Sequence, residues 1–152
     1  MTFIGCRQSS EEPTTSKGKP VIVLQLEGED VVKQPTPEQV REALSRMSPT
    51  DAPGYMILEG PGEDYAQVAG GDGVFTVEWR EHSSSGFRHW KAGLHGKPTS
   101  GDAVVPTTSG DITVKSNERL NLDEVEAIFV EFLTTKGRSE KFAWRDISGM
   151  FE

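Results

Sequence analysis

The fold is decided by residues 74–92, which read VFTVEWREHSSSGFRHWKA. In the first part of this stretch apolar and polar residues alternate, so that Phe75, Val77 and Trp79 point to one side and their neighbours to the other. Such alternation is typical of a β-strand with one buried face. The connection between residues 74–81 and 87–92 is too short for a crossover, so it joins antiparallel neighbours. The stretch therefore predicts a β-hairpin.

The two tryptophans of this hairpin indicate its register. If Trp90 shares the buried face of Trp79, the two residues stand opposite each other, whereas a shift by one residue would bury the charge of Glu78. The first register is favoured, and it gathers polar side chains on the opposite face: Glu78, Arg80, His89 and Lys91, which Tyr65 and Gln67 can join. We expect this set to form one surface that faces outward.

Two amphipathic helices flank the predicted strands along the chain. The first begins at Thr36, where the threonine hydroxyl and Gln39 form a capping box, and its apolar residues recur at helical spacing as far as Met47. The second begins at Asn121, has Glu124 three residues later, and carries a broad apolar stripe. Each helix therefore has one face suited to packing on a sheet.

The remaining strands are short and are joined by glycine turns. They are expected at residues 21–26, 55–59, 64–69 and 111–116, with an edge strand or extended segment near 142–147. Residues 93–110 are expected to form a long irregular loop. The predicted class is α+β, with a mainly antiparallel meander of about four to six strands and two helices packed on one face.

Length and charge limit the possible classes of protein. The chain has 152 residues, with 24 acidic against 16 basic side chains and a net charge of −8. This length suits one globular domain over residues 20–152. Binding phosphates requires a surplus of Lys and Arg, so a general nucleic-acid binder is excluded, whereas a basic protein partner is favoured. No run approaches the roughly 18 apolar residues of a membrane-spanning helix, so no membrane span is expected.

The first 19 residues differ in composition from the rest. Residues 7–19 contain no large apolar side chain, which predicts a flexible N-terminal tail over residues 1–19. Phe3-Ile4-Gly5-Cys6 resembles the end of a bacterial lipoprotein signal, in which the cysteine receives the lipid, although a basic start and an apolar stretch are missing. The chain is expected in the cytoplasm, with a lipid anchor at Cys6 in the cell envelope as the alternative.

The sequence contains no motif of catalysis or cofactor binding that we recognise. Its three histidines have no metal-ligand spacing on a helix, and a single cysteine excludes a cysteine cluster. The serines at 83–85 lack the glycine of a nucleophile elbow. The glycines at 60–62 and 70–73 join strands instead of entering a helix, so they favour tight turns over a phosphate site. No catalytic residue, metal or cofactor is predicted.

Candidate partner-binding side chains lie at three places in the sequence. They are Glu63, Asp64 and Asp72 in the turns, Glu78, Arg80 and His89 on the polar sheet face, and Glu124 and Glu131 on the second helix. Between residues 120 and 135 the second helix carries four acidic residues and no basic one. Such a helix either keeps its outer face hydrated or presents acidic groups to a basic cleft, and taken alone it favours the hydrated face.

The order of the segments resembles a known family. PTPEQVREAL, YMILEG, DYAQVAGGDGVFTVEWRE, FRHWKA, LNLDEVEAIFVEFL and FAWRDI follow one another. Over about residues 20–147 this order is similar to that of small bacterial immunity proteins of the Imm1 type. The resemblance implies an acidic α+β domain that is encoded beside a polymorphic toxin and neutralises it. It implies no particular site residue.

The sequence leaves three functions open. The first is a non-enzymatic binding protein, such as an immunity protein, that occludes the basic site of a bacterial toxin with its carboxylates. The second is a cell-envelope lipoprotein-type binding module of unknown ligand. The third is a small enzyme that uses Glu78, Arg80 and His89, although cross-strand charge pairing also explains this set.

Overall fold

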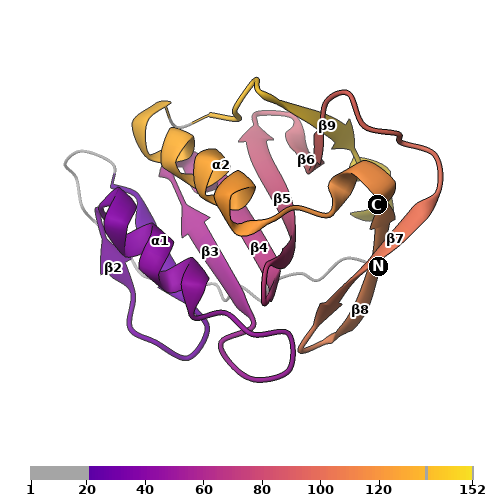
Figure 1. Cartoon of the computed structure of the whole chain (residues 1–152). Helices are drawn as coiled ribbons and strands as arrows, with labels where there is room; N and C mark the ends of the chain where they lie inside the picture. Colours follow the sequence, from indigo (N-terminus) through magenta and orange to yellow (C-terminus); the bar gives the residue numbers. More distant parts are fainter. Residues whose placement is uncertain (1–20, 136, 152) are drawn as a thin grey trace.

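The computed structural model describes residues 21–135 and 137–151. The predicted flexible tail and the lipoprotein-like segment at Cys6 lie outside these residues. In the described part of the chain the main sheet has seven antiparallel strands in the order β2-β1-β3-β4-β5-β6-β9 (Figure 1). They are β1 (Val23–Leu26), β2 (Val32–Lys33), β3 (Tyr55–Glu59), β4 (Tyr65–Gly71), β5 (Val74–Ser83), β6 (Gly86–Leu94) and β9 (Phe142–Asp146).

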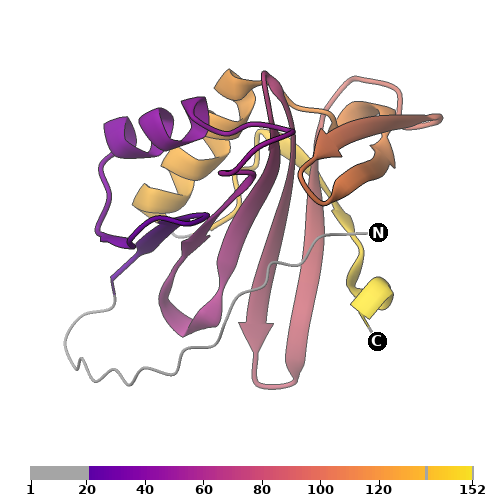
Figure 2. The same cartoon turned by 90° about the horizontal axis from the view of Figure 1, so that it is seen from below.

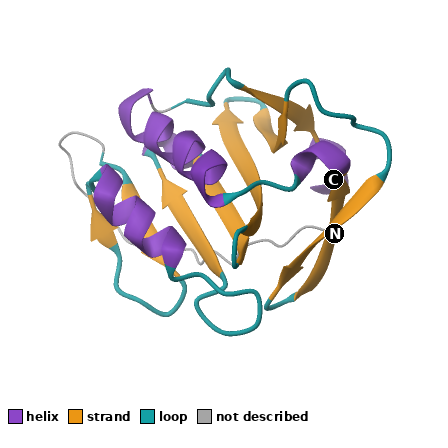
Figure 3. Cartoon of the chain, viewed as in Figure 1, coloured by secondary structure: helices purple, strands orange, loops and turns teal. Residues whose placement is uncertain are grey.

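Two α-helices, a second small sheet and three short 3-10 turns complete the described structure (Figure 3). They are α1 (Pro37–Ser45), α2 (Leu122–Thr135), β7 (Asp102–Thr107), β8 (Gly110–Lys115), η1 (Pro61–Glu63), η2 (Ser116–Glu118) and η3 (Ser148–Phe151). The predicted α+β class is confirmed. The main sheet is larger than expected because it adds the two-residue strand β2, which is too short to leave a sequence pattern, and because β9 pairs fully with β6.

The hairpin of β5 and β6 has the predicted register. Trp79 stands opposite Trp90, and Glu78 stands opposite Lys91. Trp79 is 3% exposed and lies in the main core, while Trp90 is partly buried against it. Burial of the indoles on one face therefore selects the register, as the alternation along β5 indicates.

Both helices lie on the face of the sheet that holds the tryptophans (Figures 1 and 2). Each begins with the predicted capping box: Gln39 N donates to Thr36 Oγ1 over 3.1 Å, and Glu124 N donates to Asn121 Oδ1 over 2.9 Å. The helices bury their apolar stripes, and a fully buried side chain such as Phe129 contributes about 2 kcal/mol. Within the described residues, no helix is long and apolar enough to cross a membrane.

The hairpin of β7 and β8 occupies much of the predicted loop over residues 93–110. It packs through Val105, Ile112 and Val114 against Ala69, whose side chain alternates away from the helix-facing residues of β4. The hairpin therefore covers the face of the sheet opposite the helices, at one end. The prediction of an irregular loop is wrong for residues 102–107, which form β7, and at its two ends, because β6 includes residues 93–94 and β8 includes residue 110. In β7 a proline and flanking small polar residues mask a strand that has only one neighbour in its sheet.

Candidate functional site

The polar side chains predicted on the sheet face opposite the helices do come together. Glu78 Oε1 lies 2.7 Å from His89 Nε2, and Glu78 Oε2 lies 3.3 Å from Lys91 Nζ. Arg80 donates from Nε to His89 Nδ1 over 2.9 Å, and Gln67 donates from Nε2 to Glu78 Oε1 over 3.5 Å. The register of β5 and β6 produces this network, because it sets the polar side chains of the two strands opposite one another.

The expectation that this polar set faces outward is wrong. Glu78 is 0% exposed, His89 1% and Lys91 3%, and Arg80 is half-buried. A charge buried to this extent without a partner would be very costly, so the ion pair between Glu78 and Lys91 permits the burial. In this conformation the buried members of the set present no surface to a protein partner.

A segment that lies far from the hairpin in sequence covers this network at one end, and a side chain of the hairpin itself covers the other. At one end η2 crosses β6 so closely that an added Cβ at Gly93 would lie 2.5 Å from Asn117 Nδ2. Beside it, Glu118 accepts two hydrogen bonds from Arg145, at 2.8 and 2.9 Å, and these raise the pKa of Arg145 above its ordinary value. At the other end the Arg80 guanidinium lies 4.0 Å from the ring centroid of Phe87.

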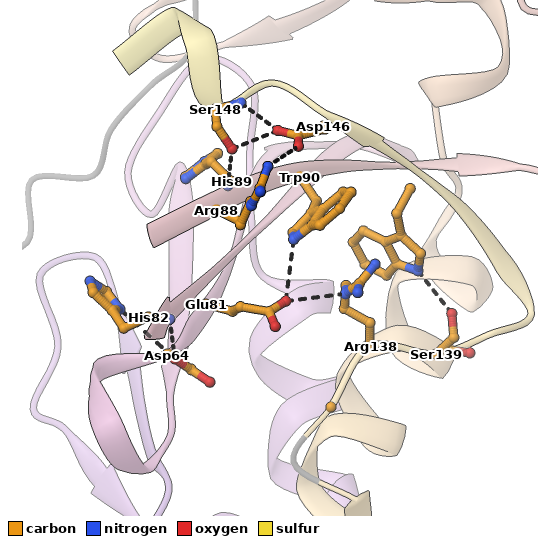
Figure 4. Close-up of polar contacts among 12 residues, drawn as sticks. Asp64, Glu81, His82, Arg88, His89, Trp90, Arg138, Ser139, Asp146 and Ser148 are labelled. Carbon is orange, nitrogen blue, oxygen red and sulfur yellow. Dashed lines mark hydrogen bonds and ion pairs between the residues drawn. The ribbon is translucent and has the colours of Figure 1, made fainter. Parts of the chain in front are cut away.

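The C-terminal segment fixes the backbone of His89 (Figure 4). Ser148 Oγ accepts a hydrogen bond from His89 N over 2.8 Å and donates one to Asp146 Oδ1 over 2.5 Å. Ile147 N donates to His89 O over 2.7 Å. The Ser148 hydroxyl, its backbone N–H and then Arg88 lower the pKa of Asp146 below its ordinary value.

The hydrogen bonds of the His89 imidazole suit a structural role better than acid–base catalysis. Because Nδ1 accepts from Arg80, the ring proton lies on Nε2 and is donated to Glu78. Both ring nitrogens are then engaged, and neither offers a lone pair that could take a proton from a substrate. The arrangement can hold the two strands in register and neutralise buried charge.

The three predicted acids of the turns do not form one site. Glu63 is 77% exposed beside His82, and Asp64 is 29% exposed because its Oδ1 accepts the His82 backbone N–H over 2.7 Å. Asp72 is exposed in the turn after β4. The length of β4 separates the first two carboxylates from the third by about 20 Å. Glu63 and Asp64 therefore cannot contact the same small ligand or side chain as Asp72.

The helical layer concentrates the negative charge of the chain. The sequences of α1 and α2 together contain six carboxylates and one guanidinium. That guanidinium, on Arg41, bonds to Glu126 and lies 3.6 Å from Asp123, whose side chain is 83% exposed. The two predicted residues of this layer differ in role, because Glu124 accepts the Asn121 N–H of the cap over 2.8 Å, whereas Glu131 lies half-buried two turns later.

A cavity of about 260 Å³ opens beside the C-terminal end of α2. We call it the tryptophan cavity, and its lining residues are Asp64, Trp79, Glu81, Gly137, Arg138, Ser139, Glu140 and Trp144. The Arg138 guanidinium lies 4.3 Å from the ring centroid of Trp90, and Arg138 Nε lies 3.6 Å from Glu81 Oε1 (Figure 4). Carboxylates, a guanidinium and indoles therefore meet at one opening.

Hydrogen bonds of two indoles hold this cavity in shape. Trp144 Nε1 donates to the carbonyl of Ser139 over 2.9 Å, which ties the chain after α2 to β9. Trp90 Nε1 donates to Glu81 Oε1 over 3.3 Å. The ring of Trp79 meets that of Phe132 edge-on, with 4.7 Å between centroids. The walls therefore combine packed side chains of the sheet with the connection between α2 and β9, which Trp144 holds in place.

Of the cavity residues, sequence reasoning identified only Asp64 as a binding candidate. The others come from the end of β5, from the chain after α2 and from β9, so no local spacing links them. For residues 142–147 the sequence predicted only an edge strand or extended segment. The one available signal was Arg138 shortly before the aromatic residues Phe142 and Trp144, and it has meaning only once β9 is known to pair with β6.

Comparison with models of protein families, with curated proteins and with solved structures finds no match to this chain. The resemblance to Imm1-type immunity proteins therefore stays a prediction. In the described residues, no group of three or more His, Cys, Asp or Glu is arranged to hold a metal ion.

Proposed function

We propose that this chain is a non-enzymatic protein that binds a basic protein partner through the outer surface of its helical layer. The observation that carries the proposal is the charge of the two helices that cover the same sheet face: together they contain six carboxylates and one guanidinium. The buried network of the opposite face supports it, because Glu78 and His89 bond to each other instead of facing solvent.

The partner that we propose is a bacterial toxin whose basic active-site cleft is occluded. The resemblance of the segment order to that of Imm1-type proteins and the net charge of −8 support this choice. A basic cleft that binds a polyanionic substrate is complementary to a row of carboxylates. The chain would then act by capture and steric exclusion and would need no catalytic group.

The proposal is tested with the protein encoded by the gene next to that of this chain. Association and dissociation rates are measured by surface plasmon resonance for the full chain and for the double variant Asp123→Lys/Glu131→Lys. A control variant, Asp102→Lys/Asp111→Lys, makes the same change in net charge on the β7–β8 hairpin.

We expect the helix variant to lower the association rate constant about tenfold more than the hairpin control, because rim charges act on the encounter. Equal effects of the two variants would show that the helical layer has no special role. Absence of binding by the unmodified chain would overturn the proposed partner.

A further inference from the structure

The tryptophan cavity has the chemistry of a site for an organic cation. We propose that it receives one arginine side chain of the basic partner. The assignment of the cation to a partner rests on the function proposed above, whereas the affinity of the cavity for a guanidinium group does not. The cavity adjoins the end of α2, so a partner lying on the helical layer could reach it.

The charge of the cavity favours a cation. Three carboxylates line it, on Asp64, Glu81 and Glu140, against the single guanidinium of Arg138. Arg138 lies against Glu81, so Asp64 and Glu140 remain as the carboxylates available to an incoming cation. Asp64 has its Oδ1 fixed by a backbone N–H, and a fixed carboxylate loses little freedom when a guanidinium binds it.

The aromatic walls suit a planar cation as well. Arg138 already shows the mode of binding, because its guanidinium lies 4.3 Å from the Trp90 ring and 5.8 Å from the Trp144 ring. A cation within about 6 Å of an indole face is attracted by the ring electrons. Trp144, which is half-buried, also lines the cavity, so a second guanidinium would meet its indole surface next to carboxylate.

The size of the cavity limits the ligand to one side chain. Pockets for whole drug-sized molecules usually measure about 300–1,000 Å³, whereas this one measures about 260 Å³ and is partly open. An arginine side chain fits such a volume, and its main chain would lie outside at the opening. The proposed occupant is therefore an anchoring residue of a larger partner.

All three tryptophans of the chain lie at this cavity or bond to its wall, so the fluorescence of the full chain reports on it. N-acetyl-argininamide is titrated in, with N-acetyl-citrullinamide as an uncharged control of the same shape and N-acetyl-lysinamide as a second cation. We expect a saturable change for the arginine compound with a Kd on the order of 1 mM, a weaker one for lysine and none for citrulline. No saturable change, or an equal change with citrulline, would overturn the proposal.

The variant Asp64→Asn/Glu140→Gln removes two charges, keeps the shape of both side chains and leaves one acceptor oxygen on each. It should weaken binding of N-acetyl-argininamide about fivefold, which corresponds to about 1 kcal/mol. The matched control Asp102→Asn/Asp111→Asn should leave binding unchanged. Far-ultraviolet circular dichroism and urea midpoints show whether each variant folds, and equal ligand affinities in the two folded variants would overturn the proposal.

The partner protein separates this inference from the function on which it rests. If Asp64→Asn/Glu140→Gln leaves partner affinity unchanged while Asp123→Lys/Glu131→Lys weakens it, the anchoring role is wrong and the proposed function stands. If the arginine compound binds and no basic partner does, the proposed function fails, and with it the assignment of the cation to a partner.

Discussion

The buried ion pair between Glu78 and Lys91 allows a quantitative test of the network on the polar sheet face. The variant Lys91→Met replaces the ammonium with an apolar group of similar length and leaves the Glu78 carboxylate, 0% exposed, without its ion-pair partner. At the observed separation of 3.3 Å and an effective dielectric constant of about 20, the lost attraction is about 5 kcal/mol. Relief of the desolvation of Lys91 offsets part of this, so we expect a net loss of about 3 kcal/mol in the free energy of unfolding.

A double-mutant cycle isolates the interaction. Glu78→Gln should cost about 3 kcal/mol as well, because it leaves the ammonium buried, whereas Glu78→Gln/Lys91→Met removes both charges and should cost about 2 kcal/mol less than the sum of the single variants. Urea unfolding followed by tryptophan fluorescence gives the free energies. In thermal unfolding each single variant should lower Tm by about 10 °C. A loss below about 1 kcal/mol for Lys91→Met, or additive losses around the cycle, would refute the reasoning.

Three further predictions concern single positions. Replacing Ser148 by Ala should raise the pKa of Asp146 toward its ordinary value, which carbon-13 NMR titration measures. The lowered pKa stabilises the folded protein at pH values above the ordinary pKa, and this stabilisation is lost as the pH falls through the folded-state pKa. Gly70→Ala should destabilise the fold by about 2 kcal/mol or more in urea unfolding, because its φ is +122° and a Cβ would lie 2.2 Å from Val74 O. Thr36→Ala should cost about 1 kcal/mol through loss of the helix cap, whereas Thr50→Ala, outside the helices, should cost less than half of that.

The parts of the fold that were predictable from the sequence are those that local chemistry determines. Alternation along β5 and the two indoles determine the register of the hairpin, and the capping residues Thr36 and Asn121 mark the first turns of both helices. In each case neighbouring residues carry enough information, because strand period and cap geometry operate over a few positions.

The burial of the polar face was not predictable from the hairpin itself. The side chains of Glu78 and His89 share one face as expected, but their exposure also depends on η2 and on Tyr65 of β4, whose ring lies 6.4 Å from that of His89. A charged residue on a strand normally indicates a solvated face, and its burial is possible only because Lys91 lies opposite.

The tryptophan cavity was unpredictable for a related reason. Arg138 and Trp144 take on a common role with Glu81 only after β9 has joined the edge of the sheet next to β6. Likewise, β7 was hidden by Pro106, which is tolerated because the strand has a neighbour on one side alone. Both features arise from pairings between segments distant in the chain.

Whether the helical layer captures a basic protein is tested most directly by the salt dependence of the association rate constant with the protein of the neighbouring gene. Long-range attraction between an acidic layer and a basic cleft predicts that this constant falls at least about tenfold between 20 mM and 500 mM sodium chloride, while the dissociation rate changes little. An association rate that is independent of salt would contradict electrostatic capture by the carboxylates of α1 and α2.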